Sequence, residues 1–446
     1  MNSFLILIHR IQILNTSISM NLSDMSDSLT TLTKLIVLFC NIAFWLVVIT
    51  VGYNFFLMIC GIPNNKKIEL ISKTEVKPQT RFAILISARN EEIVIPYLIR
   101  SLKVMDYPKE LFDIFVIADN CSDQTAAVAK AEGAKVCSRN DETRATKGYA
   151  LNWFFSHNLK QLLVKYDHCV IFDADNLVDP NFLKVMDRHI QTGETFLAGY
   201  MDCKSPEKSV IASANALFYL NRSRFLHQAR NNLGLPLASV SGTGFSFDLK
   251  LIKDTGWDTQ TLTEDVEFTM QMILKDQKPV YIKEAIFYDE PTSEFMPMIR
   301  QRFRWGMGSV QTMRLMTGKL FRYALNYNHK AFDAFWFLAQ IPFFFVSALL
   351  SIVKMLILLP TYVDNQAWFA RDLIVPIVAY MATVLSLILL VKLENKNLKQ
   401  YFKGIVAYPF LGIVWAGLQM AAIFCKDATW HPIAHTQGVE LEHLTK

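Results

Sequence analysis

The sequence lacks the cysteine patterns that indicate a disulfide framework or a structural metal site. Its seven cysteines are scattered, with no CxxC pair and no histidine at a spacing suited to zinc. A Walker-type glycine-rich loop is also missing, which disfavours an ATPase. At a net charge of +5, the lysines and arginines form no stripe of the kind that binds DNA or RNA. We therefore expect no nucleic-acid partner, and a reducing, cytosolic environment suits the central region.

Charged side chains are missing from four long stretches of the chain, residues 35–65, 334–353, 373–391 and 404–425. Each is close to the ~20 residues that a helix needs to cross ~30 Å of hydrocarbon. The alternative is a large soluble protein with buried core helices, but four such stretches together favour a multi-pass protein of the cell membrane. The last stretch contains Pro409 and several glycines, so we expect it either to span the membrane or to re-enter it.

The flanking charges predict an orientation. "NNKKIELISK" follows the first stretch and "KLENKNLKQYFK" separates the last two, whereas the acidic "NLSDMSDSL" precedes the first. Positive-inside reasoning places both lysine-rich segments in the cytoplasm, together with the large polar region between the first two stretches. The predicted organisation is an N-terminal segment outside the cytoplasm (1–33), a transmembrane helix (34–65), a cytosolic domain (77–300), interfacial helices (301–330), three transmembrane or re-entrant helices (331–425) and a tail (426–446).

The polar middle of the chain alternates between strand and helix patterns. "RFAILISAR", "FDIFVIAD" and "CVIFDAD" are typical of buried strands, and "DQTAAVAKAEGA" and "KGYALNWFFSHNLKQLL" of helices. This alternation predicts an α/β fold with a doubly wound, mostly parallel sheet. The polar clusters "SARNEE", "ADNCSD" and "DAD" each follow a strand. They should therefore converge at the carboxyl edge of the sheet, where open α/β sheets bind ligands.

Asp173 and Asp175 end an apolar run with one small residue between them. On an extended chain they would project the same way, and two like charges so close repel each other. A divalent cation such as Mg²⁺ can hold both carboxylates, with substrate phosphates as further ligands. A solvated turn is the alternative interpretation.

Two further segments carry polar residues on predicted helices. In "TLTEDVEF", Asp265 opens an amphipathic helix, where an acidic residue also stabilises the helix dipole without any catalytic role. "QRFRWGMGSVQTMRLM" mixes arginines with Trp and Met, which is typical of an interfacial helix whose basic residues face lipid headgroups.

Taken together, "VIFDADN", "SARNEE", "VIADNCSDQT", "GTGF", "TED" and "QRFRW" resemble the motifs of membrane-embedded glycosyltransferases of family 2, from about Arg81 to Trp305. That group includes cellulose, chitin, hyaluronan and poly-N-acetylglucosamine synthases. The resemblance implies a GT-A-like fold and an inverting hexosyltransferase that moves a sugar from a UDP-sugar onto a growing polysaccharide, assisted by Mg²⁺ or Mn²⁺. Transfer of one sugar to a lipid acceptor, giving a glycolipid, is the alternative. The lipid bilayer and an export or accessory subunit are the other partners expected.

The resemblance also implies a role for particular residues. The catalytic residues would be Asp265, as the general base, and its neighbour Glu264, and the metal ligands would be Asp175 and Asp173. The nucleotide-sugar would be bound by Ala88, Arg89, Glu91, Asp119, Lys147, Asp173, Gln301 and Arg304, and the acceptor by Gly242, Thr243, Gly244 and Trp305. Two departures from the family pattern are Ser87, where proline is usual, and an acceptor loop without the cysteine that some processive relatives carry there.

An alternative from a different class of function is a transporter or channel whose cytosolic domain only senses a nucleotide. Apart from Lys354 near the end of one predicted span, the spans contain no ionisable residue with which to carry a substrate. The retained base, metal pair and arginine also favour the enzyme.

Overall fold

The computed structural model describes residues 31–341, 343, 346, 366–425 and 438–441. The chain forms two compact units, residues 1–52 with 342–370 and residues 53–341 with 371–446. The described part of the first unit contains the beginnings of two helices, α2 (Thr31–Gly61) and α13 (Gln366–Leu393). The second unit contains the β-sheet and all the predicted site residues, and the description below concerns this unit.

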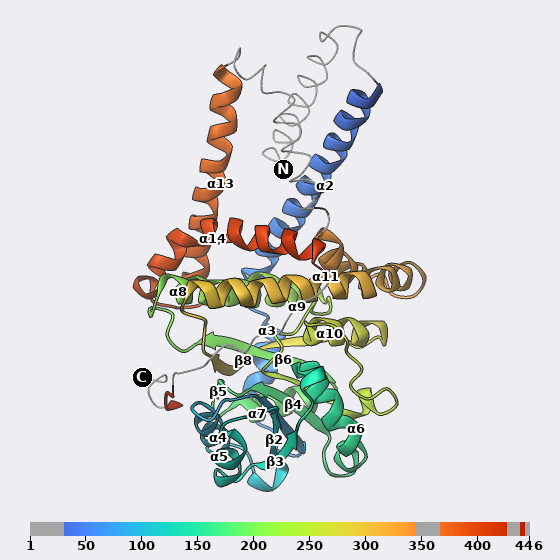
Figure 1. The fold of residues 1–446 in the computed structure, drawn as a ribbon, viewed down its shortest axis with the longest axis vertical. Coiled ribbons are helices and arrows are strands. Elements are labelled where there is room, and N and C mark those ends of the chain that lie inside the picture. Colours follow the sequence, from blue (N-terminus) through green and yellow to red (C-terminus); the bar gives the residue numbers. More distant parts are fainter. Residues whose placement is uncertain (1–30, 342, 344–345, 347–365, 426–437, 442–446) are drawn as a thin grey trace. The chain divides into compact units, whose positions relative to one another are not determined.

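Eight strands of the second unit form one sheet (Figure 1) in the order β3-β2-β1-β4-β7-β6-β8-β5. Four of the seven pairs of neighbouring strands are parallel. They are β3-β2, β2-β1, β1-β4 and β6-β8. β7 lies antiparallel between β4 and β6, so this half of the sheet is mixed. The strands are β1 (Phe82–Ala88), β2 (Phe112–Asp119), β3 (Lys135–Arg139), β4 (His168–Asp173), β5 (Leu177–Val178), β6 (Phe196–Cys203), β7 (Phe245–Asp248) and β8 (Val280–Asp289).

Helices cover both faces of the sheet, as the doubly wound prediction requires. α4 (Ile95–Lys103), α5 (Thr125–Ala131) and α7 (Phe182–Ile190) share a hydrophobic cluster on one face. α6 (Lys147–Lys165) and α10 (Glu264–Leu274) share the cluster on the other. Strand side chains alternate between the two clusters, and because both of their faces are buried the central strands β1 and β4 are nearly continuous apolar runs.

The remaining helices form a layer beyond α10. α8 (Val210–Asn221), a π-helix (Arg222–Gln228) and α9 (Ala229–Leu233) follow one another directly. α14 (Leu398–Phe424) runs alongside α8 and the long α11 (Phe295–Asn326) (Figure 1). The short elements are α3 (Lys66–Lys73) and the 3₁₀ turns Lys109–Leu111, Glu142–Arg144 and Leu249–Ile252.

Within the described residues, α14 is the one helix whose length and composition suit it to crossing a membrane. Three shorter apolar helical stretches cover Val48–Gly61, Ala331–Ile341 and Ile377–Leu393. Half of the predicted span at 334–353 lies outside the described residues. The multi-pass arrangement therefore stays a prediction.

Candidate active site

The polar clusters at the strand ends meet at one edge of the sheet, as predicted. In the strand register, Ala88 pairs with Ala118 and Ser87 pairs with Asp173. The first two clusters are also joined directly, because the backbone N–H of Ser122 donates to Asn90 Oδ1 at 2.8 Å. Three segments that are far apart in the sequence therefore lie together at one edge of the sheet.

At the end of β2, on this edge of the sheet, Asp119 forms a buried ion pair with Arg139. Their side chains are about 6% and 5% exposed, and Arg139 Nη1 lies 2.6 Å from Asp119 Oδ1. Burial raises the pKa of Asp119, although the guanidinium opposes this shift. Sequence reasoning missed Arg139. The signal was its place at the end of β3, where it is the register partner of Asp119.

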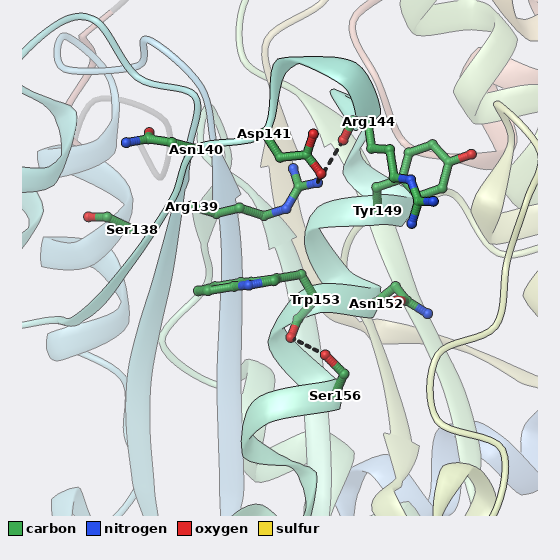
Figure 2. A pocket seen from close by; sticks show the side chains of 9 residues that line it. All are labelled: Ser138, Arg139, Asn140, Asp141, Arg144, Tyr149, Asn152, Trp153 and Ser156. Carbon is green, nitrogen blue, oxygen red and sulfur yellow. Dashed lines mark hydrogen bonds and ion pairs between the residues drawn. The ribbon is translucent and has the colours of Figure 1, made fainter.

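A hollow of about 450 Å³ opens beside this ion pair, between the end of β3 and the first turns of α6. Figure 2 shows the Trp153 ring below the Arg139 side chain, and Arg144 next to Tyr149. The Arg144 Cζ atom is 5.9 Å from the centre of the Tyr149 ring. The hollow thus combines aromatic rings with guanidinium groups.

Lys147, at the first position of α6, joins the third cluster to the predicted acceptor loop. Its ammonium group donates to the Asp173 carboxylate and, at 2.8 Å, to the Gly242 carbonyl oxygen. Burial lowers the pKa of Lys147, but the carboxylates of Asp173 and Glu264 outweigh burial and raise it overall. Lys147 therefore keeps its positive charge at the centre of the site.

The two aspartates of the third cluster have different surroundings, which corrects the expectation that both project from one strand. β4 ends at Asp173, and Asp175 lies in the following turn. The Asp173 side chain is 39% exposed, whereas Asp175 is 5% exposed. The alternation rule ceases to apply where the strand ends.

Asn176, which sequence reasoning quoted within "VIFDADN" without a role, ties this turn to its surroundings. Its Oδ1 accepts from the Thr243 hydroxyl and from the Asp173 backbone N–H. Its amide group donates to Asp289 Oδ1 at 2.7 Å. Asn176 thereby holds the turn between Thr243, in the predicted acceptor loop, and the end of β8.

The residues present fit a divalent cation that binds together with its substrate. Asp173 and Asp175 supply hard carboxylate oxygens, and Mg²⁺ is typically held by one or two carboxylates plus substrate phosphates. Within the described part of the chain, no three His, Cys, Asp or Glu side chains are grouped as in a metal site built by protein alone. The donor set is therefore suited to a cation that the phosphates of a substrate complete.

Asp265 and Glu264 form the first turn of α10 and face two different glycines. A Cβ atom on Gly242 would lie 3.6 Å from Asp265 Oδ2, and one on Gly148 would lie 3.3 Å from Glu264 Cβ. Burial raises the pKa of both carboxyls, and with the added charge of Asp265 the pKa of Glu264 reaches about 7. Two adjacent, half-buried carboxyls favour a pair that retains a proton near neutral pH.

The glycines of the predicted acceptor loop are required by the backbone. Gly242 and Gly244 have φ angles of +75° and +64°, which side chains with a Cβ rarely adopt. A Cβ atom on Gly244 would also overlap the Phe287 ring. The loop can therefore pass close to Asp265 only with glycine at these positions.

The helix that carries "QRFRW" contacts the segment that precedes Asp265. The Leu262 N–H donates to Gln311 Oε1 at 3.0 Å, and the Thr263 and Thr312 hydroxyls are 3.2 Å apart. Gly308 also lies on this face, and Arg304 precedes it by one helical turn. α11 thus brings Arg304 toward the same site.

Gln301 and Trp305, the other site residues predicted in this motif, contact residues of neighbouring segments. Gln301 Oε1 accepts from the Thr292 hydroxyl at 3.2 Å, and the Trp305 ring stacks on Phe218 of α8 at 6.2 Å. Arg304 is half-buried and forms no ion pair with any acidic side chain that the structure describes. Its guanidinium group is thus without an anionic partner among these residues.

Replacing Gly308 with alanine is expected to lower both the thermal stability and the activity of the protein. The new Cβ would lie 2.7 Å from the Thr263 backbone nitrogen, so α11 or the segment before Asp265 must shift. Overpacking of this kind costs about 1–3 kcal/mol. Gly318→Ala, on the same helix with no atom within 4 Å of its Cβ, is the control. It should leave the melting temperature unchanged or raise it. Equal effects of the two substitutions would contradict the close approach at Thr263.

Comparisons with known proteins agree with this geometry. The family model described as glycosyltransferase like family 2 matches residues 78–308. The chain is 25% identical to the probable glycosyltransferase YdaM of Bacillus subtilis over 292 residues, 63% of this chain and 66% of that protein. It is 27% identical to a β-monoglucosyldiacylglycerol synthase of Trichormus variabilis over 240 residues, 51% of this chain and 49% of that protein. It is 23% identical to a poly-β-1,6-N-acetyl-D-glucosamine synthase of Staphylococcus epidermidis over 294 residues, 63% of this chain and 68% of that protein.

A solved structure shares the fold. The mannosyltransferase PcManGT from Pyrobaculum calidifontis, in complex with GDP-Man and Mn²⁺, aligns with a TM-score of 0.51 at 14% identity. The alignment covers 83% of this chain and 99% of that one. At this identity the likeness establishes the α/β fold alone.

Proposed function

Because the chain belongs to glycosyltransferase family 2, we propose that it transfers a sugar from a UDP-sugar to a growing saccharide chain at the membrane. The observation that carries this proposal is the meeting of Lys147, Asp173 and Asp265 around Gly242. Lys147 offers a positive charge that can bind a diphosphate, and Asp265 offers a carboxyl that can act as a base. The contacts of both residues with Gly242, and of Lys147 with Asp173, support a shared site. The interpretation as a nucleotide-sensing transporter gives no reason for this arrangement.

In this proposal the donor lies along the edge of the sheet where the three polar clusters meet. Its uridine end binds at Asp119 and Arg139, next to the loop of Ala88, Arg89 and Glu91. Its diphosphate lies between Lys147 and the α11 residues Arg304 and Gln301. Guanidinium groups suit phosphate because their donors form a planar fork.

Asp173 and Asp175 would hold Mg²⁺ or Mn²⁺. The chemistry that such an ion supplies is neutralisation of the charge on the departing nucleoside diphosphate. The Mn²⁺ in the complex of the fold relative PcManGT supports this assignment. Lys147 contributes a second positive charge next to Asp173.

Asp265 acts as the general base in this scheme. Its carboxylate takes the proton from the acceptor hydroxyl as the hydroxyl oxygen forms a bond to the anomeric carbon. The bond from that carbon to the diphosphate oxygen breaks, and UDP leaves with the electron pair. One displacement inverts the anomeric centre. Burial and the charge of Asp265 raise the pKa of Glu264 to about 7, so the pair can hold one proton while its other carboxylate accepts the proton of the acceptor hydroxyl.

The acceptor is placed at Gly242, Thr243, Gly244 and Trp305. A second candidate function, transfer of one sugar to a lipid, is favoured by the similarity to β-monoglucosyldiacylglycerol synthase. Both acceptors suit a site whose helices adjoin a bilayer.

We propose a multi-pass membrane protein with its catalytic domain in the cytoplasm. α14 exposes Val406, Phe410 and Ile413 and buries Tyr401 and Ile405. One side of this helix packs along α8 and α11, and its exposed apolar side could face lipid in either the spanning or the re-entrant form.

The test is to purify the protein in detergent with Mg²⁺ or Mn²⁺ and to offer a panel of UDP-sugars. UDP release and product size are measured with and without added lipid. A high-mass product that a glycosidase digests supports the polysaccharide synthase. One discrete glycolipid, formed only with added lipid, supports the second candidate. Nucleotide binding without turnover of any donor would overturn both.

A further inference from the structure

After α8 the helical hydrogen bonding changes from the α-helical to the π-helical pattern, next to the predicted acceptor loop. α8 continues directly into the π-helix Arg222–Gln228. Hydrogen bonds of a π-helix join residues five apart, which places such residues on the same face. Arg222 and His227 are such a pair, and Arg222 Nε donates to His227 Nε2 at 3.3 Å. Because arginine has no acceptor, His227 Nε2 must accept this bond, so the ring is neutral.

The π-helical turn directs the guanidinium group of Arg222 toward the segment before Gly242. Arg222 Nη2 donates to Ser239 Oγ at 2.8 Å and to the Val240 carbonyl oxygen. From the other side, the Val240 N–H donates to Thr269 Oγ1 at 3.2 Å, and the Thr269 hydroxyl donates to the Asp265 carbonyl oxygen at 2.7 Å. Ser239 and Val240 are fully buried. The segment is therefore held between Arg222 and the helix that carries the base.

Arg222 also acts on Asp265 through its charge. Burial raises the pKa of Asp265, and Arg222 opposes this shift more than any other group does. Lys147, from α6, opposes it to a smaller extent. Glu264, in the same turn of α10, is the neighbouring carboxyl. The motifs that identified the other site residues do not include Arg222.

We propose that Arg222 is a positioning residue of the transfer reaction. It holds Ser239 and Val240 so that Gly242 stays against Asp265, and its positive charge favours the ionised carboxylate that accepts the proton of the acceptor hydroxyl. This inference rests on the proposed function, in which Asp265 is the base. A π-helix is rare and is often found at functional sites, in keeping with such a role.

The test compares three substitutions by their profiles of kcat/KM against pH. Arg222→Gln keeps hydrogen-bond donors but removes the charge, so the ionised form of Asp265 becomes less favourable. The acid limb of the profile should move to higher pH by about one unit, a roughly tenfold loss of rate on that limb. At higher pH the rate should approach that of the wild type. Arg222→Lys should keep the limb in place. Arg222→Met, which loses charge and donors, should also lower kcat at every pH and raise the KM for the acceptor.

Arg224 provides the matched control. It lies on the same π-helix and is 3% exposed, but it pairs with Glu394 at 3.2 Å and donates to Asn64, outside the site. Arg224→Gln should lower the melting temperature and leave the acid limb in place. UDP binding by each variant shows that its donor site is folded.

Two results would overturn the role of Arg222: an acid limb that does not move in Arg222→Gln, or an equal movement in Arg224→Gln. A wild-type protein that transfers sugar from no UDP-sugar would instead overturn the proposed function. The two failures are therefore distinguishable.

Discussion

Replacing Asp265 with asparagine is expected to lower the rate of sugar transfer by about 10²–10⁴-fold, the usual contribution of a general base. Asparagine keeps the shape of the side chain beside Gly242 but accepts no proton. Because the substitution removes only the group that accepts the proton, the affinity for UDP should stay within about twofold of that of the wild type. The measurement is kcat from UDP release, with UDP binding determined by calorimetry on the same preparation.

Asp276→Asn is the control for this substitution. Asp276 lies just beyond the other end of α10, is exposed, and has a φ angle of +57°, which asparagine tolerates. It should transfer sugar at the wild-type rate.

The pH dependence of the wild type adds a second test, because a base is active only when ionised. Its rate must fall as the pH drops through the pKa of Asp265. A rate that Asp265→Asn leaves within tenfold of the wild type would move the role of base to Glu264 or elsewhere.

Replacing Asp175 with asparagine is expected to have the second-largest effect, a loss of about 10²–10³-fold at saturating donor. A metal that stabilises a departing diphosphate contributes several kcal/mol, and about 1.4 kcal/mol corresponds to a factor of ten. The neutral amide removes one of the two carboxylates that would hold the ion. The midpoint for activation by Mg²⁺ or Mn²⁺ should rise accordingly. Treatment of the wild type with EDTA should abolish turnover, and either cation should restore it.

Asp179→Asn is the control for the metal prediction. The Asp179 carboxylate accepts from the Asn181 backbone N–H at 2.9 Å, a bond that an asparagine oxygen can also accept. Both the rate and the metal midpoint should match those of the wild type. Full activity of the wild type in EDTA, or an unchanged metal midpoint in Asp175→Asn, would show that Asp175 is not a metal ligand.

Much of the sheet was predictable because its strands are buried on both faces. The segments at β1, β2 and β4 were identified from their continuous apolar runs, and α5 and α6 from helical patterns between them. β7 was not identified as a strand. It is a short segment that lies antiparallel between β4 and β6, and its pairing depends on residues far away in the chain.

The sequence by itself determined the alternation of strands and helices, the convergence of "SARNEE", "ADNCSD" and "DAD" at one edge, and the resemblance carried by the motifs. Apolar patterns and strand order suffice for these, since parallel strands share their carboxyl edge. Only the tertiary structure decided which partners surround each group. Arg139 reaches Asp119 because β3 lies next to β2. Asn176 meets Thr243, and Arg222 reaches Val240, through contacts across 67 and 18 positions of the chain. Such pairings follow from packing in three dimensions, and no local periodicity in the sequence predicts them.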